Sequence, residues 1–289
     1  MDERIAVVTG ATSGIGKEIA RGLLRRGFRV GIVGRSAMRG EDAVEELGGR
    51  ADMFLADLSV RPDVRRVAAE IEERYGRLDV LVNNAGVHMM RAKVSADGYD
   101  RMIATNHLGP FLLTNLLLGM LGRSAPSRVV VVASEAHRHA GRFDPERLAE
   151  PGSYRAAGSF RVYARSKLLN ILFVQELAER LEGTGVTANA VSPGVVATGL
   201  VRELRWAERA SGLISHTPAV RTPEQGARMA LELATDEKYE GCSGGFYSSA
   251  PGAGLLPRAG ALKDRELRKA VWRASAHLVG LPGTIALGT

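Results

Sequence analysis

Short runs of apolar, mostly β-branched residues alternate along the chain with longer stretches in which apolar residues recur every three or four positions. The short runs predict strands that are buried on both faces of a parallel sheet, because they are almost continuously hydrophobic. They occupy residues 5–9, 29–34, 52–56, 78–83, 128–133 and 185–191, with a seventh run at 244–248. The spacing between them leaves room for a connecting helix each time.

The longer stretches predict amphipathic helices between the strands. They cover residues 14–26, 37–47, 64–75, 99–121, 160–181 and 223–233, and a last helix over 264–279 carries Trp272. This alternation is typical of an α/β fold with a doubly wound parallel sheet (Rossmann fold), with about seven strands and helices on both faces. No repeat or linker divides the chain, so we expect one domain over 1–289 with a C-terminal extension at about 249–289.

The predicted helix over 99–121 is apolar nearly all round in its second half. A helix of this kind must be covered on several sides. A second subunit, in a homodimer or homotetramer, would cover it, and so would neighbouring helices of the same chain.

Charge and composition narrow the function classes. The net charge is +7, but the 39 basic residues are scattered among 32 acidic ones without a recognisable nucleic-acid-binding pattern, so we expect a solvated surface and no nucleic-acid partner. The single Cys242 excludes an intramolecular disulfide, and the N-terminus shows no leader pattern, which favours a cytoplasmic protein. The longest near-apolar stretch, 111–121, is about half of the ~20 residues that a membrane span needs.

A glycine-rich turn, TGATSGIG, follows the first predicted strand and opens the first helix. Helix N-termini at the carboxyl ends of parallel strands bind phosphate through backbone amides. Gly10 permits a tight bend, Gly14 lets the backbone approach a pyrophosphate, and Gly16 removes a side chain between helix and sheet. Glycines at helix starts are also ordinary turn formers. The expected dinucleotide-binding residues of this turn are Gly10, Thr12, Ser13, Gly14, Ile15 and Gly16.

The end of the second predicted strand indicates the form of the dinucleotide. An acidic residue at this point would bind the adenosine ribose, but the chain has Arg35, with Arg39 four residues on. Arginine can bind a 2′-phosphate, which favours NADP(H) over NAD(H), unless Arg35 is an ordinary surface residue. Asp57 and Leu58 follow the third strand and are placed to meet the adenine ring, although Asp57 could equally cap the next helix.

Of the six tyrosines, only Tyr163 has a lysine four residues later, Lys167. On a helix this spacing places both side chains on one face, although it is also common on helix surfaces. A nearby cation favours phenolate, so we expect the pKa of Tyr163 to move from ~10 towards working pH. Tyr163 is therefore a candidate general acid or base, and Lys167 could also reach the cofactor ribose.

Two further residues have a place in this arrangement. Ser134 ends the fifth strand, where its hydroxyl could hold a substrate oxygen beside Tyr163, or could simply cap a turn. Asn106 precedes Pro110 by four residues. Because proline has no N–H, the Asn106 carbonyl would lose its helical partner and could hold a water. We hypothesise a proton relay through that water to Lys167; the alternative is a plain helix kink.

The motifs TGATSGIG, NNAG at 83–86, Asn106, Ser134, YARSK at 163–167 and SPGVVAT at 192–198 resemble, in order, those of the short-chain dehydrogenase/reductase family. The resemblance implies that Asn106, Ser134, Tyr163 and Lys167 form a catalytic tetrad. It also implies that the NNAG segment supports the sheet and the cofactor, and that 193–198 approaches the nicotinamide. The cofactor-binding residues implied in this way are Asn84, Ala85, Gly86, Tyr163, Lys167, Pro193, Gly194, Val196 and Thr198.

Within that family, TNHLGPFLLT, the long segment between Ser134 and Tyr163 and the C-terminal helix look most like the retinol-dehydrogenase-like branch. This implies NADP(H)-dependent interconversion of a carbonyl and an alcohol on a small lipophilic substrate. Apolar residues among charges over about 199–220 predict either a lid over an apolar pocket or an ordinary surface amphipathic helix. Membrane-associated relatives carry an N-terminal hydrophobic anchor that this sequence does not show, so another apolar or aromatic carbonyl fits as well as a retinoid.

Three rival functions are disfavoured. Gly241–Gly245 reads GCSGG, as in serine hydrolases, but Ser243 does not lie between a strand and a helix. A non-catalytic NADP(H)-binding sensor or scaffold could keep the same frame, but such proteins usually lose the tyrosine or the lysine. His137 and His139 have no evident third ligand, so we expect no metal site.

Overall fold

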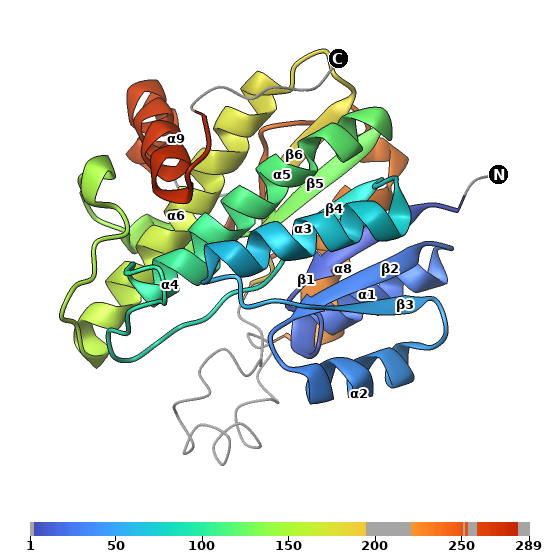
Figure 1. Ribbon diagram of the computed structural model, residues 1–289. Coiled ribbons are helices and arrows are strands. Elements are labelled where there is room, and N and C mark those ends of the chain that lie inside the picture. The colour runs from blue at the N-terminus through green and yellow to red at the C-terminus, as the bar shows by residue number, and fades with distance from the viewer. Residues whose placement is uncertain (1–2, 195–220, 251, 254–258, 283–289) are drawn as a thin grey trace.

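The computed structural model describes residues 3–194, 221–250, 252–253 and 259–282. Its sheet contains seven parallel strands in the order β3-β2-β1-β4-β5-β6-β7 (Figure 1). The strands are β1 (Ile5–Thr9), β2 (Arg29–Gly34), β3 (Ala51–Leu55), β4 (Val80–Asn83), β5 (Ser127–Val132), β6 (Val186–Ser192) and β7 (Phe246–Ser248). This confirms the predicted doubly wound parallel sheet.

The strand order reverses between β1 and β4, which pair with each other through Ala6 opposite Val80. On its other side β1 pairs with β2, where Ile5 lies opposite Arg29. All five residues of β1 are buried. In a sheet of this kind the loops leaving the two sides of the reversal diverge, and a ligand crevice forms at the carboxyl ends of the strands.

Helices cover both faces of the sheet (Figure 1). One face carries α3 (Arg61–Tyr75), α5 (Gly109–Arg123) and α6 (Ala156–Arg180), and α9 (Arg265–Val279) packs against α6. The other face carries α1 (Gly14–Arg25), α2 (Ala37–Leu47) and α8 (Pro223–Thr235). Shorter helical turns are α4 (Arg101–Ile103), η1 (Ala104–Leu108), η2 (Glu135–His139), η3 (Pro145–Arg147), η5 (Glu237–Tyr239) and η7 (Gly260–Lys263). None of the helices in these described ranges is long and apolar enough to span a bilayer.

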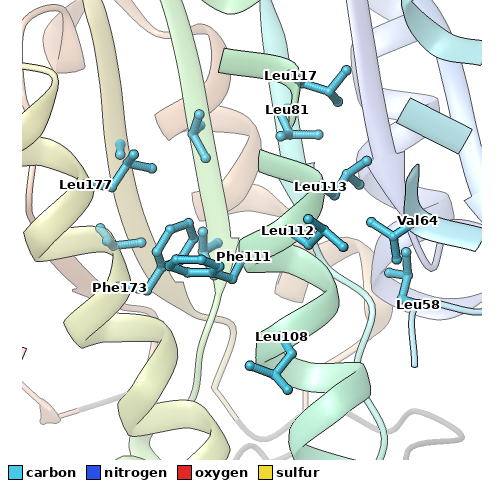
Figure 2. Packing of buried hydrophobic residues seen from close by; sticks show 14 of the residues in the cluster. Leu58, Val64, Leu81, Leu108, Phe111, Leu112, Leu113, Leu117, Phe173 and Leu177 are labelled. Atoms are coloured by element: carbon cyan, nitrogen blue, oxygen red, sulfur yellow. The ribbon is translucent and has the colours of Figure 1, made fainter. Parts of the chain in front are cut away.

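The apolar helix α5 is covered by other helices of its own chain. Leucines of α5 pack towards β4 and α3, while Phe111 faces Phe173 of α6 (Figure 2). The ring centroid of Phe111 lies 5.1 Å from that of Phe173 and 4.9 Å from that of Trp272 on α9. Trp272 is 2% exposed. Neighbouring helices of the same chain therefore cover this helix, as one of the two alternatives predicted, and covering by a second subunit stays a prediction.

Several boundaries differ from the predictions for local reasons. The predicted helix over 99–121 begins at Arg101, capped by Asp100, and passes through the π-helical turn η1 before it continues as α5. Pro110, which cannot donate to an α-helical bond, follows that turn directly. The strand predicted over 244–248 starts only at Phe246, because Gly244 has a φ of +78°, which is not extended.

Candidate active site

Three positions at the turn between β1 and α1 require glycine. Gly10 and Gly14 have φ angles of +66° and +58°, which residues with a side chain rarely adopt. A Cβ on Gly10 would lie 2.8 Å from Ala85 Cα, and one on Gly16 would lie 2.4 Å from Asn84 Nδ2 and 2.5 Å from the Gly10 carbonyl oxygen. Gly16 is thus needed for close packing, as predicted. Its nearest neighbours are the turn itself and the NNAG segment, rather than the strands of the sheet.

The N-terminus of α1 fits a dinucleotide pyrophosphate. The Ser13 side chain does not cap the helix, and the described first turn holds no acidic residue. Backbone amides and the positive end of the helix dipole therefore face the crevice. The tight backbone at Gly10 and Gly14 brings these amides close to any group bound there.

Thr9 joins this turn to the NNAG segment. Its buried Oγ1 accepts hydrogen bonds from the backbone N–H groups of Asn84 and Ala85, both at 3.0 Å. In return, Asn84 Nδ2 donates to the carbonyl oxygens of Thr9 at 2.9 Å and Gly10 at 3.3 Å. No role for Thr9 follows from the motif alone, but a fully buried hydroxyl at a strand end requires a partner. Asn84 and Ala85 are therefore held at the turn, as the resemblance implied.

Arg35 is exposed at the end of β2, directly before the α2 cap Ser36. A Cβ on Gly34 would lie 2.7 Å from Thr12 Cγ2, so the residue before Arg35 abuts the glycine-rich turn. Arg35 and the turn consequently lie at the same edge of the sheet. That placement is the one required of a residue that meets the adenosine end of a dinucleotide.

Asp57 and Leu58 follow β3, and their contact with an adenine ring stays a prediction. Asp57 accepts hydrogen bonds from the N–H and hydroxyl of Ser59, at 2.9 and 2.7 Å, and pairs with Arg101 at 3.0 Å. Burial alone would raise the pKa of Asp57, but the Ser59 hydrogen bonds and the Arg101 charge outweigh it and lower that pKa. Asp57 is not the cap of α3, which is Val60. The Leu58 side chain packs into the core (Figure 2), so only its backbone remains available to an adenine ring.

Tyr163 lies on α6 and is 8% exposed, with its phenol close to the hydroxyl of Ser134. Burial raises the pKa of Tyr163 to about 12, although the nearby Ser134 hydroxyl works in the opposite direction. The predicted lowering by Lys167 is therefore wrong for this structure. The ammonium lies 5.7 Å from the centre of the phenol ring, and desolvation outweighs its influence.

Lys167 is 3% exposed and donates a hydrogen bond from Nζ to the carbonyl oxygen of Val132, at 2.9 Å. Burial lowers the pKa of this lysine to about 8. A Cβ on Gly86 would lie 3.3 Å from Lys167 Nζ and 3.6 Å from Asn106 Oδ1. The last residue of the NNAG segment thus lies between two members of the predicted tetrad.

Asn106 lies fully buried in the π-helical turn η1. Its Oδ1 accepts from the N–H of Val87 at 2.7 Å, and its Nδ2 donates to the Val87 carbonyl oxygen and to Ser166 Oγ, both at 2.9 Å. The side chain therefore joins the NNAG segment to α6. The proposed water relay concerns the backbone carbonyl of Asn106 and stays a prediction, while π-helical turns occur frequently at functional sites.

Ser134 caps a turn, which is one of its two predicted roles, and it lies beside Tyr163 as the other role requires. Its Oγ accepts from the N–H of Ala136 at 3.2 Å, which caps η2, and it also contacts the Tyr163 phenol. In the same turn, His139 is exposed, but His137 is 1% exposed and its Nδ1 lies 2.8 Å from the Ser134 carbonyl oxygen. Of these two histidines, the structure thus buries His137 and exposes His139. The described part of the chain contains no cluster of three metal-ligating side chains.

The remaining predicted residues fall into two groups. Pro193 and Gly194 directly follow β6, and Gly194 has a φ of +81°. Val196, Thr198 and the predicted lid over 199–220 lie outside the described residues.

The serine of the GCSGG segment has a structural role. Ser243 Oγ accepts from the N–H of Ala188 at 3.0 Å and lies 3.5 Å from its carbonyl oxygen. These contacts hold the GCSGG segment against the backbone of β6. The segment leads into β7, whereas a nucleophilic serine in this motif requires a strand-to-helix turn. The structure thus removes the basis for a serine hydrolase.

Matches to family models, to related sequences and to solved structures place the chain among known proteins. Residues 4–144 match a family model described as short chain dehydrogenase, and residues 148–244 match one described as Enoyl-(Acyl carrier protein) reductase. Retinol dehydrogenase 12 of Bos taurus is 38% identical over 288 residues, covering 96% of this chain and 87% of that protein. Retinol dehydrogenase 11 of Homo sapiens is 40% identical over 284 residues, covering 96% and 86%.

Among solved structures, an uncharacterized protein from Mycobacterium paratuberculosis superposes with a TM-score of 0.76 at 31% identity, covering 98% of this chain and 95% of that one. A 3-ketoacyl-(acyl-carrier-protein) reductase from Brucella melitensis, in complex with NADH, superposes with a TM-score of 0.67 over 85% of this chain and 96% of that one. Its identity is 23%, so this likeness supports the fold alone.

Proposed function

Because this chain belongs to the short-chain dehydrogenase/reductase family, in its retinol-dehydrogenase-like branch, we propose that it interconverts a carbonyl and an alcohol on an apolar or aromatic substrate with NADP(H). One observation carries the proposal. A buried phenol beside the Ser134 hydroxyl lies near a buried ammonium, at the edge of the sheet that also holds the glycine-rich turn. The amides of α1 would hold the pyrophosphate, and Arg35 would bind the 2′-phosphate.

In the reducing direction, Tyr163 donates its proton to the substrate oxygen, and Ser134 orients that oxygen against the phenol. Burial keeps the phenol protonated at neutral pH, since it raises the pKa of Tyr163 to about 12. Lys167 stabilises the phenolate that is left behind, because it remains largely protonated below its pKa of about 8. When bound, the nicotinamide would supply or accept a hydride at the substrate carbon.

Replacing Tyr163 tests this assignment. We expect Tyr163→Phe to lower turnover at least ~100-fold, as loss of a general acid does, while NADPH affinity stays within a few-fold. Tyr239→Phe is the matched control, since Tyr239 lies on η5, away from the tetrad. Turnover would be followed as NADPH consumption with a panel of ketones, aldehydes and quinones. Undiminished turnover in Tyr163→Phe refutes the mechanism, and tight NADPH binding by the wild type without any turnover favours a sensor or scaffold.

The choice of NADP(H) is tested separately at Arg35. We expect Arg35→Asp to lower the ratio of kcat/KM for NADPH to that for NADH by about tenfold to a hundredfold, because charge-assisted hydrogen bonds are worth about 1.5–3 kcal/mol. Arg50→Asp makes the same change of charge on an exposed residue that precedes β3, at the amino ends of the strands. It should leave the ratio unchanged. An equal ratio in the wild type and Arg35→Asp contradicts the assignment.

A further inference from the structure

The face of α6 that carries Tyr163 and Lys167 has a third polar member. Ser159 precedes Tyr163 by four residues, as Lys167 follows it by four, so the three side chains lie in one row along the helix. Ser159 is fully buried. Its hydroxyl donates to the carbonyl oxygen of Ala156 at 2.8 Å, which commits its single proton.

His88 reaches this row from the segment that follows NNAG. Its Nε2 lies 3.1 Å from Ser159 Oγ. Because the Ser159 hydroxyl is within hydrogen-bond distance of the Ala156 carbonyl oxygen, a better acceptor than Met90 Sδ at 3.8 Å, we assign the imidazole as the donor in this hydrogen bond. This assignment places a proton on Nε2, and the contact holds the ring at that end.

The imidazole held in this way packs on the tyrosine ring. The ring centroids of His88 and Tyr163 lie 5.0 Å apart, with an angle of 32° between the planes. Ser134 lies beside the phenol hydroxyl, and His88 contacts the ring itself. The other residues packed around Tyr163 include Met89 and Met102, whose flexible side chains specify an orientation poorly.

We propose that His88 and Ser159 form a positioning pair, which fixes the orientation of the Tyr163 phenol relative to the substrate oxygen. This rests on the proposed function of Tyr163 as a proton donor. A displacement of about 1 Å in a reacting group can cost about a hundredfold in rate. Residues that hold the phenol ring in place should therefore raise the rate of proton transfer. An apolar residue could fill the same space, but it could not be oriented by a buried hydroxyl.

The kinetic test separates orientation from binding. We expect His88→Ala to lower kcat by about tenfold to a hundredfold, with KM for NADPH changed less than twofold. Ser159→Ala should give a smaller fall, because alanine is well tolerated in a helix and the ring contact partly remains. His88→Phe keeps a ring but loses the bond to Ser159, and His88→Gln keeps a donor but loses the ring, so each should recover only part of kcat. Unchanged kcat in His88→Ala overturns the proposal, as does full recovery of kcat in His88→Phe.

A second readout does not depend on turnover. In protein labelled with [¹³Cζ]tyrosine, the Tyr163 resonance is identified by its loss in Tyr163→Phe. We expect this resonance to shift in His88→Ala and Ser159→Ala but not in His277→Ala, which removes an exposed histidine of α9. If no carbonyl or alcohol is turned over, the proposed function fails while the NMR experiment still decides the positioning. A resonance that stays in place in His88→Ala refutes the positioning pair whatever the turnover.

Discussion

His107, in the turn η1, links the C-terminal helix to the segment that carries Asn106. Its Nε2 lies 2.8 Å from Ser275 Oγ on α9, and its Nδ1 lies 3.3 Å from Asn170 Oδ1 on α6. The imidazole is 1% exposed. Burial lowers the pKa of His107 to about 4, although the hydrogen bond with Asn170 acts against it. We therefore expect this one residue to make the stability of the fold depend on pH.

The sign and size follow from proton linkage. In the unfolded chain His107 regains its ordinary pKa of 6.5, so between about pH 4 and 6.5 the unfolded state binds more protons than the folded state. Stability from this group is complete above pH 6.5 and is lost as the pH falls towards about 4. At ~1.4 kcal/mol per pH unit, the free energy of unfolding should drop by about 2 kcal/mol on going from pH 6.5 to pH 5, and by about 3 kcal/mol at pH 4.

Urea unfolding between pH 5 and pH 7.5 measures how the free energy of unfolding depends on pH. The difference in free energy of unfolding between wild type and His107→Gln should change by about 2 kcal/mol over that range, because glutamine can bond to Ser275 but does not titrate. His277→Gln, which changes an exposed histidine of α9, is the matched control. A constant difference for His107→Gln refutes the linkage.

Three other substitutions follow from the packing. Trp272→Ala should lower the free energy of unfolding by about 3–5 kcal/mol in urea, because a large side chain leaves a cavity between helices. Gly16→Ala should weaken NADPH binding at least ~10-fold in calorimetry, since an added methyl group meets the backbone of the turn; Gly49→Ala, where nothing lies within 4 Å, is its control. Ser243→Ala should cost about 1–2 kcal/mol of stability through the lost bond to Ala188, with turnover unchanged, and abolished turnover would reopen the hydrolase alternative.

The architecture could be predicted because it follows from patterns between residues that are close together in the sequence. Continuous apolar runs and helical periodicity determined the order of strands and helices, because burial of the two faces of a sheet selects these patterns wherever they occur. Gly10 and Gly14 could be recognised in advance because their backbone conformation excludes other residues. The spacing of Tyr163 and Lys167 was equally readable, since a helix places such residues on one face.

The surroundings of those residues were decided by the tertiary structure alone. The pKa of Tyr163 is raised rather than lowered because desolvation depends on everything packed around the phenol, not on the lysine one turn away. His88 meets Ser159 across 71 residues of sequence, and His107 meets Ser275 across 168. Local sequence patterns carry no information about which distant polar groups become neighbours, so these contacts come into being only when the helices pack.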